Sequence, residues 1–146
     1  MIEIRAFEES DTEEVVALWA ACGLLRPWND PRKDIARKLA VQRDMFLIGR
    51  AGDRIVGTVM AGYDGHRGSI YYLAVDPERQ GHGLGAQLMA HAEALLLSRG
   101  CPKINVSVRA GNAGVISFYQ LRGYRLEGDS YAVTMGLRLI PDAPRG

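Results

Sequence analysis

A glycine-rich turn between an apolar segment and a long amphipathic helix constrains this sequence more than any other feature. The turn reads Gln80-Gly81-His82-Gly83-Leu84-Gly85 and follows the strand-like segment 68–75. Apolar residues then recur at helical spacing until Gly100, which predicts the end of a helix. The chain is therefore expected to run from a strand through a tight turn into a helix.

Such a turn can bind an anion, because the first N–H groups of a helix lack helical partners and point at one place. Glycine permits a positive φ and lets a phosphate approach without meeting Cβ atoms. Gly81, Gly83 and Gly85 stand at alternate positions, which a simple connection does not require. Arg79 and His82 could add donors at the rim. The pattern favours a pyrophosphate site over a plain strand-to-helix turn.

Two other nucleotide-binding readings fail on their context. Gly81, Gly83 and Ala86 satisfy the dinucleotide pattern G-x-G-x-x-A. That fold, however, places the turn after its first strand and an acidic residue about 20 positions later. Here three or four strands are expected before the turn, and segment 100–103 has no acid. The chain also lacks the G-K-[ST] sequence of a nucleotide P-loop.

The rest of the chain predicts an α/β fold with a mixed sheet and the element order β-α-α-β-β-β-α-β-α-β-β. Ser10 with Glu13 is a capping-box signature for the first helix, and Asp30-Pro31 predicts the start of a second helix over 31–43. The other two helices follow the glycine turn and Asn112. The expected strands cover 2–7, 45–50, 54–64, 68–75, 103–108, 124–129 and 131–137.

Length and composition set the class of protein. The 146 residues match one ordinary domain, expected over 1–140 with a short tail at 141–146. A net charge of +1 gives no field that would recruit nucleic acid. No run reaches the roughly 20 apolar residues of a membrane span, and the first residues lack a signal core. We expect a cytoplasmic protein with neither nucleic acid nor membrane as a partner.

Cysteine usage argues against a metal site. Cys22 and Cys101 are the two cysteines, and they lack the spacing of zinc ligands or of a disulfide framework. Both are expected to pack as small apolar residues. No metal is therefore expected.

The sequence resembles the GNAT family of N-acetyltransferases over essentially its whole length. Segment 80–85 fits the family's Q/R-x-x-G-x-G/A motif for acetyl-CoA. The family's downstream element is matched by Asn112, Phe118, Tyr119, Gly123 and Tyr124. Segments 25–31 and 62–68 look like the bacterial YpeA-type acetyltransferases, and the chain is similar also to ribosomal-protein N-acetyltransferases.

The resemblance implies the GNAT acyl-CoA N-acyltransferase fold, whose middle strands, here 69–75 and 103–108, splay apart to admit the pantetheine arm. Backbone groups of Leu73 and Val75 would bind pantetheine and the acetyl carbonyl. The remaining contacts to acetyl-CoA are expected from Arg79, Gln80, Gly81, His82, Gly83, Leu84, Gly85, Asn112 and Tyr119.

The implied reaction is direct attack by a primary amine, on a small metabolite or a protein or peptide N-terminus, in a ternary complex with acetyl-CoA. Acetyl transfer needs a polarised carbonyl and a proton for the departing thiolate. By the resemblance, the Val75 N–H fills the first role and the Tyr119 phenol the second. From its spacing alone, Tyr119 reads as a core aromatic residue.

Several roles stay open. The base is left among Asp64, His66, Tyr72 and Glu127, acting directly or through water. The acceptor side could include Trp28 and Asp30, together with Asp64 and Tyr72. Trp28 would offer an aromatic face and Asp30 a carboxylate to a cationic amine; alternatively, Trp28 anchors its loop and Asp30 caps the second helix.

A second class of function also stays open. A non-catalytic CoA-binding sensor or partner-binding module would keep the glycine turn without needing Tyr119. A homodimer formed through the terminal strand 131–137 is a further open question.

Overall fold

The computed structural model describes residues 1–127 and 135–141, and the chain divides into two compact units. The described part of the first unit is residues 1–106, and that of the second is residues 107–127 and 135–141. The expected single domain over 1–140, with a tail at 141–146, stays a prediction.

A five-stranded sheet forms the centre of the first unit, in the order β1-β2-β3-β4-β5. Strands β1 to β4 pair antiparallel with their neighbours, whereas β5 joins β4 in parallel. The strands are β1 (Ile2–Ala6), β2 (Phe46–Ala51), β3 (Arg54–Tyr63), β4 (Gly68–Val75) and β5 (Ile104–Asn105). The mixed sheet with its helices confirms the predicted fold class.

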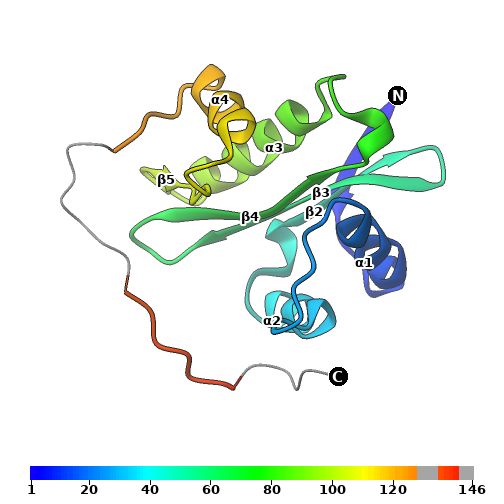
Figure 1. Ribbon diagram of the computed structural model, residues 1–146, viewed down its shortest axis with the longest axis horizontal. Helices are drawn as coiled ribbons and strands as arrows, with labels where there is room; N and C mark the ends of the chain where they lie inside the picture. The colour runs from blue at the N-terminus through cyan, green and yellow to red at the C-terminus, as the bar shows by residue number, and fades with distance from the viewer. Residues whose placement is uncertain (128–134, 142–146) are drawn as a thin grey trace. The chain divides into compact units, whose positions relative to one another are not determined.

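Helices cover both faces of this sheet (Figure 1). Helix α3 (Leu84–Ser98) lies on one face, and α1 (Thr12–Ala21) and α2 (Pro31–Gln42) lie on the other. A Cβ at Gly57 of β3 would lie 2.8 Å from Leu88 Cδ1, so a glycine here lets α3 approach the sheet closely. The sequence order of these helices and strands agrees with the prediction up to β5.

The main core lies between the sheet and α1. Phe7 and Phe46 stack with ring centroids 4.4 Å apart, and Trp19 of α1 stacks on Phe46 at 6.0 Å. Trp19, Phe46 and Val15 are fully buried. Val15 and Trp19 therefore lie on the face that α1 buries against the sheet.

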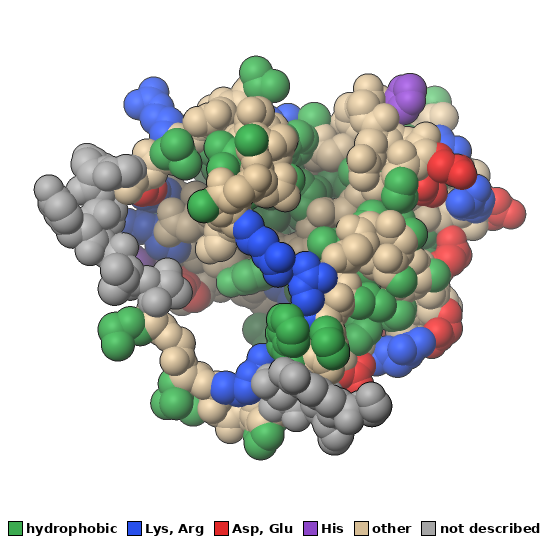
Figure 2. Space-filling view, viewed as in Figure 1, with side chains coloured by type: hydrophobic (Ala, Val, Ile, Leu, Met, Phe, Trp, Pro, Cys, Tyr) green, Lys and Arg blue, Asp and Glu red, His purple; other side chains and the backbone are tan. Residues whose placement is uncertain are grey.

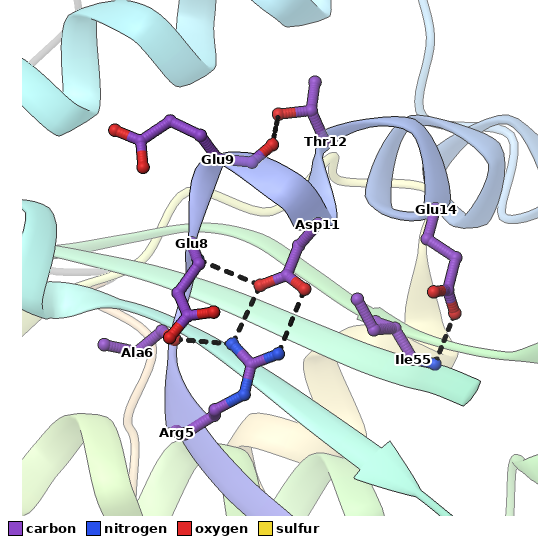
Figure 3. Close-up of polar contacts among 8 residues, drawn as sticks. All are labelled: Arg5, Ala6, Glu8, Glu9, Asp11, Thr12, Glu14 and Ile55. Atoms are coloured by element: carbon purple, nitrogen blue, oxygen red, sulfur yellow. Dashed lines mark hydrogen bonds and ion pairs between the residues drawn. The ribbon is translucent and has the colours of Figure 1, made fainter. Parts of the chain in front are cut away.

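The first helix begins differently from the prediction. Ser10 and Glu13 do not form a capping box; instead a 3-10 turn, η1 (Glu9–Asp11), precedes α1. The Asp11 carboxylate accepts the N–H of Glu8 at 2.9 Å and both terminal nitrogens of Arg5 at 2.8 and 3.0 Å (Figure 3). The cap depends on Arg5 of β1, a contact that local sequence spacing does not show.

Helix α1 is also fastened to the sheet by a polar contact. The Glu14 carboxylate accepts the backbone N–H of Ile55, in β3, at 2.7 Å (Figure 3). Ile55 is the second residue of β3 and Glu14 the third residue of α1. The bond therefore ties the first turn of α1 to the beginning of β3.

Strand β5 is shorter than the predicted strand 103–108. Its ladder with β4 has two pairs, Gly68 with Ile104 and Ser69 with Asn105. The ladder ends at Asn105, one residue before the end of this part of the first unit. The residues of β4 that follow Ser69 therefore have no strand partner on this side among the described residues.

The last two predicted strands, 124–129 and 131–137, fall partly outside the described residues. Their described parts, 124–127 and 135–137, carry no assigned strand. Both strands, and the dimer contact expected from the second, stay predictions.

The second unit contains helix α4 (Ala113–Leu121). Asn112 Oδ1 accepts the Val115 N–H at 3.2 Å, which confirms Asn112 as the predicted N-cap. Gly123 follows the helix with a φ of +92°, in the left-handed region that glycine adopts most easily. Within residues 1–127 and 135–141, no helix combines the length and the hydrophobicity that a membrane span needs.

Candidate active site

The glycine turn is an open cradle at the start of α3. Gly81 and Gly83 both have a φ of +83°, and a Cβ at either position would meet no other atom within 4 Å. Gly83 is the N-cap of α3, and no side chain caps the helix there. The first helical bond runs from the Gln87 N–H to the Gly83 carbonyl at 3.0 Å, so the N–H groups before Gln87 lack helical partners. This geometry suits a phosphate group.

The side chains around the cradle have different surroundings. Arg79 and His82 are exposed and line an open hollow of about 460 Å³ beside the turn. Leu84 also borders this hollow, but it is 4% exposed, and its side chain packs against Gly57. Gly85 is half-buried.

Strand β4 contains a β-bulge just before the cradle. Thr58 pairs with Ala74 and Met60 with Tyr71, so two residues, Tyr72 and Leu73, lie opposite Val59 alone. The extra residue exchanges the faces of the sheet on which the following side chains of β4 lie. A Cβ on Gly68 would meet Cys101 and Leu96 on the α3 face, whereas Ala74 packs in the core with Trp19 on the other face. A regular strand would place Gly68 and Ala74 on the same face.

The bulge also changes which neighbouring strand each backbone N–H group of β4 points toward. The Gly68 N–H donates to Lys103 on the β5 side, whereas the Asp76 N–H donates to Val56 of β3. Successive backbone N–H groups of a strand point to opposite sides. The N–H of Val75, next to Asp76, therefore points away from β3, and the N–H of Leu73 points the same way. Both face the side where β4 has lost its strand partner. The role expected for Leu73 and Val75, binding of pantetheine and the acetyl carbonyl, requires backbone N–H groups that are free of β3.

The carbonyl of Val75 is already engaged. It accepts a hydrogen bond from Gln80 Nε2 at 3.2 Å and from the Cys22 thiol at 3.3 Å. Gln80 therefore ties the end of β4 to the glycine turn. Burial raises the pKa of the Cys22 thiol, which keeps it protonated rather than nucleophilic.

Tyr72 has an unusual backbone conformation. Its φ is +51°, and it is the one non-glycine residue with a positive φ among the described residues. Holding a bulky residue there costs about 1–2 kcal/mol. The ring stacks on Trp19, and the hydroxyl donates to Asp34 Oδ2 at 2.7 Å. Burial and then the bond to Asp34 raise the pKa of Tyr72 well above its usual value, so the phenol keeps its proton.

Sequence reasoning missed this bulge and its partners. Segment 68–75 alternates like a regular strand and has no internal glycine to mark a left-handed position. Asp34 and Trp19 read as a helix-surface and a core residue. The doubled tyrosine at 71 and 72 is the signal that could have found it, because neighbouring aromatic residues do not fit a half-buried strand.

Of the proposed acceptor residues, Tyr72 lies in β4, and Trp28, Asp30 and Asp64 lie on loops of the first unit. Trp28 is 40% exposed, so it does not anchor its loop in the core. Asp30 caps α2 by accepting the Arg32 N–H at 2.9 Å. Asp64 accepts the N–H groups of His66 and Arg67 in the β3–β4 turn, each at 2.7 Å. These bonds lower the pKa of the Asp64 carboxyl.

The residues proposed in the second unit are Asn112 and Tyr119. The Asn112 side chain caps α4, as described above. Tyr119 is 7% exposed and packs edge-on against the rings of Phe118 and Tyr124, each 5.2 Å away. Burial raises the pKa of the Tyr119 phenol, which keeps a proton available for donation at neutral pH. Glu127, a candidate base, is exposed in the same unit.

Within the described ranges, no group of three His, Cys, Asp or Glu side chains is placed to hold a metal ion. Acidic and basic side chains lie interspersed at the right-hand edge of the view in Figure 2. Ion pairs of the first unit include Glu13 with Arg32 and Asp76 with Arg54.

Comparison of the sequence with known families and proteins finds acetyltransferases. Residues 6–124 match the model of the acetyltransferase (GNAT) family. The chain is 49% identical over 141 residues to an acetyltransferase of Sodalis glossinidius, which covers 97% of this chain and 98% of that protein. An acetyltransferase of Yersinia enterocolitica is 48% identical over the same coverage.

Solved structures of low sequence identity share the fold. The ribosomal-protein-S18-alanine N-acetyltransferase from Escherichia coli superposes with a TM-score of 0.71 at 23% identity, covering 84% of this chain and 77% of that one. The PaiA N-acetyltransferase from Thermoplasma acidophilum, solved in complex with coenzyme A, gives 0.73 at 20% identity, covering 87% and 91%.

Proposed function

This chain belongs to the GNAT family of acetyltransferases, and from that premise we propose that it transfers the acetyl group of acetyl-CoA to a primary amine. The acceptor is a small metabolite or the N-terminus of a protein or peptide. The observation that carries the proposal is the open, uncapped glycine turn placed directly after a bulged strand whose Val75 N–H points away from β3.

The residues of the turn fit a pyrophosphate. The positions that Cβ atoms would fill at Gly81 and Gly83 are empty, so a phosphate can reach the backbone N–H groups of the first turn of α3. Arg79 and His82 would add donors at the rim, and Leu84 and Gly85 would contribute N–H groups. The PaiA protein of Thermoplasma, which has the same fold, was solved with coenzyme A, which supports this assignment.

The bound thioester would supply an activated acetyl group, and the chain would do three things for the transfer. The N–H groups of Leu73 and Val75 would bind pantetheine and stabilise negative charge on the carbonyl oxygen, with Asn112 at pantetheine. Tyr119 would give its proton to the leaving thiolate. No acetylated side chain is needed, because the amine would attack directly.

The acceptor side and the base are proposed more broadly. Tyr72 holds its proton, which leaves Asp64, His66 and Glu127 as candidate bases. Trp28 is exposed beside Asp30, and an aromatic face with a carboxylate suits a cationic amine. The Escherichia coli structure of this fold is named for acetylating the alanine of ribosomal protein S18, which supports testing peptide N-termini.

The test is a screen of amines and N-terminal peptides with acetyl-CoA, in which free thiol is measured as it forms. We expect thiol release that depends on the amine, together with an acetylated product. Tight binding of acetyl-CoA with no transfer to any acceptor would favour the CoA-binding sensor instead. A chain that binds no acetyl-CoA would overturn the proposal.

A further inference from the structure

Tyr72 occupies a position at which a glycine would be the simpler choice. Its φ of +51° lies in the left-handed region, where a side chain is strained. Strain of this kind persists only where the surroundings hold the residue in place. The residues that hold Tyr72 therefore determine whether the bulge keeps its shape.

The first restraint comes from α1 and β3. The Tyr72 ring stacks on Trp19 with centroids 3.8 Å apart and planes 13° apart. Trp19 Nε1 donates to Thr58 Oγ1 at 2.9 Å, and Thr58 Oγ1 donates to the Tyr72 carbonyl at 2.8 Å. Trp19 and Thr58 are fully buried. Trp19 thus holds the Tyr72 ring, and Thr58 holds the Tyr72 carbonyl.

The second restraint comes from α2 and the loop before it. The Tyr72 hydroxyl donates to Asp34 Oδ2 at 2.7 Å, and Asn29 Nδ2 donates to the same oxygen at 2.5 Å. Asn29 Nδ2 also approaches the Tyr72 hydroxyl at 3.4 Å. The Asp34 side chain is 20% exposed, so this bond is shielded from most of the competing water. Asp34 thus fixes the far end of the ring that Trp19 holds by its face.

We propose that Asp34 is a positioning residue: through its hydrogen bond to the Tyr72 hydroxyl it holds the bulge of β4 and thereby aims the backbone N–H groups of Leu73 and Val75 at the acetyl carbonyl. The inference rests on the proposed function, because it assigns a purpose to those N–H groups. It adds a carboxylate on α2 that acts through the Tyr72 hydroxyl.

The geometry explains how a contact on α2 reaches the carbonyl site. The bulge is the step that turns the N–H groups of Leu73 and Val75 away from β3. If Tyr72 relaxes to a negative φ, the extra residue is no longer accommodated at the same place, and the direction of the following N–H groups changes. An effect on carbonyl polarisation, with acetyl-CoA still bound by the glycine turn, is therefore the expected signature.

The experiment measures the carbonyl stretch of acetyl-CoA labelled with ¹³C at the thioester carbonyl, by infrared difference spectroscopy on the complex. It needs no acceptor. In the wild-type protein the stretch should move to lower wavenumber on binding, because backbone N–H groups polarise the carbonyl. In Tyr72→Phe and Asp34→Ala most of that shift should be lost, while the Kd for acetyl-CoA stays within about fivefold.

Three comparisons separate positioning from a general loss of structure. Asp34→Asn keeps an oxygen that accepts the tyrosine hydroxyl, so it should restore the shift. Tyr72→Gly adopts the positive φ without restraint, so adding Asp34→Ala to it should change nothing further. Tyr63→Phe removes another tyrosine hydroxyl, one that donates to Gly65 in the β3–β4 turn, and should leave the shift intact.

The outcomes distinguish the inference from the proposed function. A wild-type protein that binds no acetyl-CoA would contradict the proposed function. Binding with the same carbonyl shift in wild type, Tyr72→Phe and Asp34→Ala would overturn the inference alone. So would an Asp34→Ala effect of equal size in the Tyr72→Gly background, because Asp34 would then not act through Tyr72.

Discussion

Adding one methyl group at Gly83 tests whether the glycine turn binds the pyrophosphate of acetyl-CoA. In Gly83→Ala the new Cβ enters space that holds no other atom within 4 Å, so it displaces no part of the protein. It would instead occupy the path by which a phosphate reaches the N–H groups of α3. Any loss of affinity would then come from the ligand and not from repacking.

The conformational cost of this change can be matched at the other end of the same helix. Gly83 and Gly100 both have a φ of +83°, and a Cβ at Gly100 also meets nothing within 4 Å. An alanine should cost about 1–2 kcal/mol at either position. Both variants should therefore melt lower than the wild type by a similar amount, about 3–8 °C.

Binding should separate the two variants. A phosphate kept from one backbone donor loses a charge-assisted hydrogen bond of about 1.5–3 kcal/mol, which is roughly 10–150-fold in Kd. Titration calorimetry with acetyl-CoA should show that loss for Gly83→Ala and an unchanged Kd for Gly100→Ala. Equal affinities in the two variants would refute the reasoning and leave the glycines with a role in the turn alone.

Three further predictions concern chemistry and stability. Tyr119→Phe should keep its affinity for acetyl-CoA but transfer acetyl about 10²-fold more slowly in single turnovers, and an unchanged transfer rate would make Tyr119 a packing residue. Thr58→Val should lower the unfolding free energy by about 1–3 kcal/mol in urea titrations, because it leaves the buried Trp19 N–H unsatisfied; an effect below about 0.5 kcal/mol would count against that. Burial alone would raise the pKa of Asp11, but hydrogen bonds led by Arg5 lower it below the unfolded value of about 3.9. The ionised Asp11 therefore stabilises the fold fully above about pH 4, and this contribution is lost as the pH falls below that value. The difference in unfolding free energy between wild type and Asp11→Asn should accordingly narrow below about pH 4 and stay constant above it.

The sequence predicted best those features that depend on neighbouring residues. Asp30-Pro31 begins α2 and Asn112 caps α4, because capping is decided within a few positions. The glycine turn was found for a similar reason, since positive φ at Gly81 and Gly83 leaves a mark in the sequence.

Features that depend on contacts distant in sequence were missed. The start of α1 is set by Arg5 reaching Asp11 from β1, so the local pattern at Ser10 pointed to the wrong cap. The bulge at Tyr72 is held by residues of α1, β3 and α2, and the one mark of it within β4 is the pair of tyrosines at 71 and 72. Of the candidate site, the sequence could identify the glycine turn but not the restraint on the strand before it.

The most direct test of the central claim follows the acetyl group itself. The protein is incubated with isotope-labelled acetyl-CoA, first alone and then with a responsive amine from the screen, and the masses of the protein and the amine are measured. We predict that the intact protein gains no label and that each released thiol is matched by one labelled amine. Label retained on the protein, or thiol released without a labelled amine, would contradict direct transfer from acetyl-CoA to the amine.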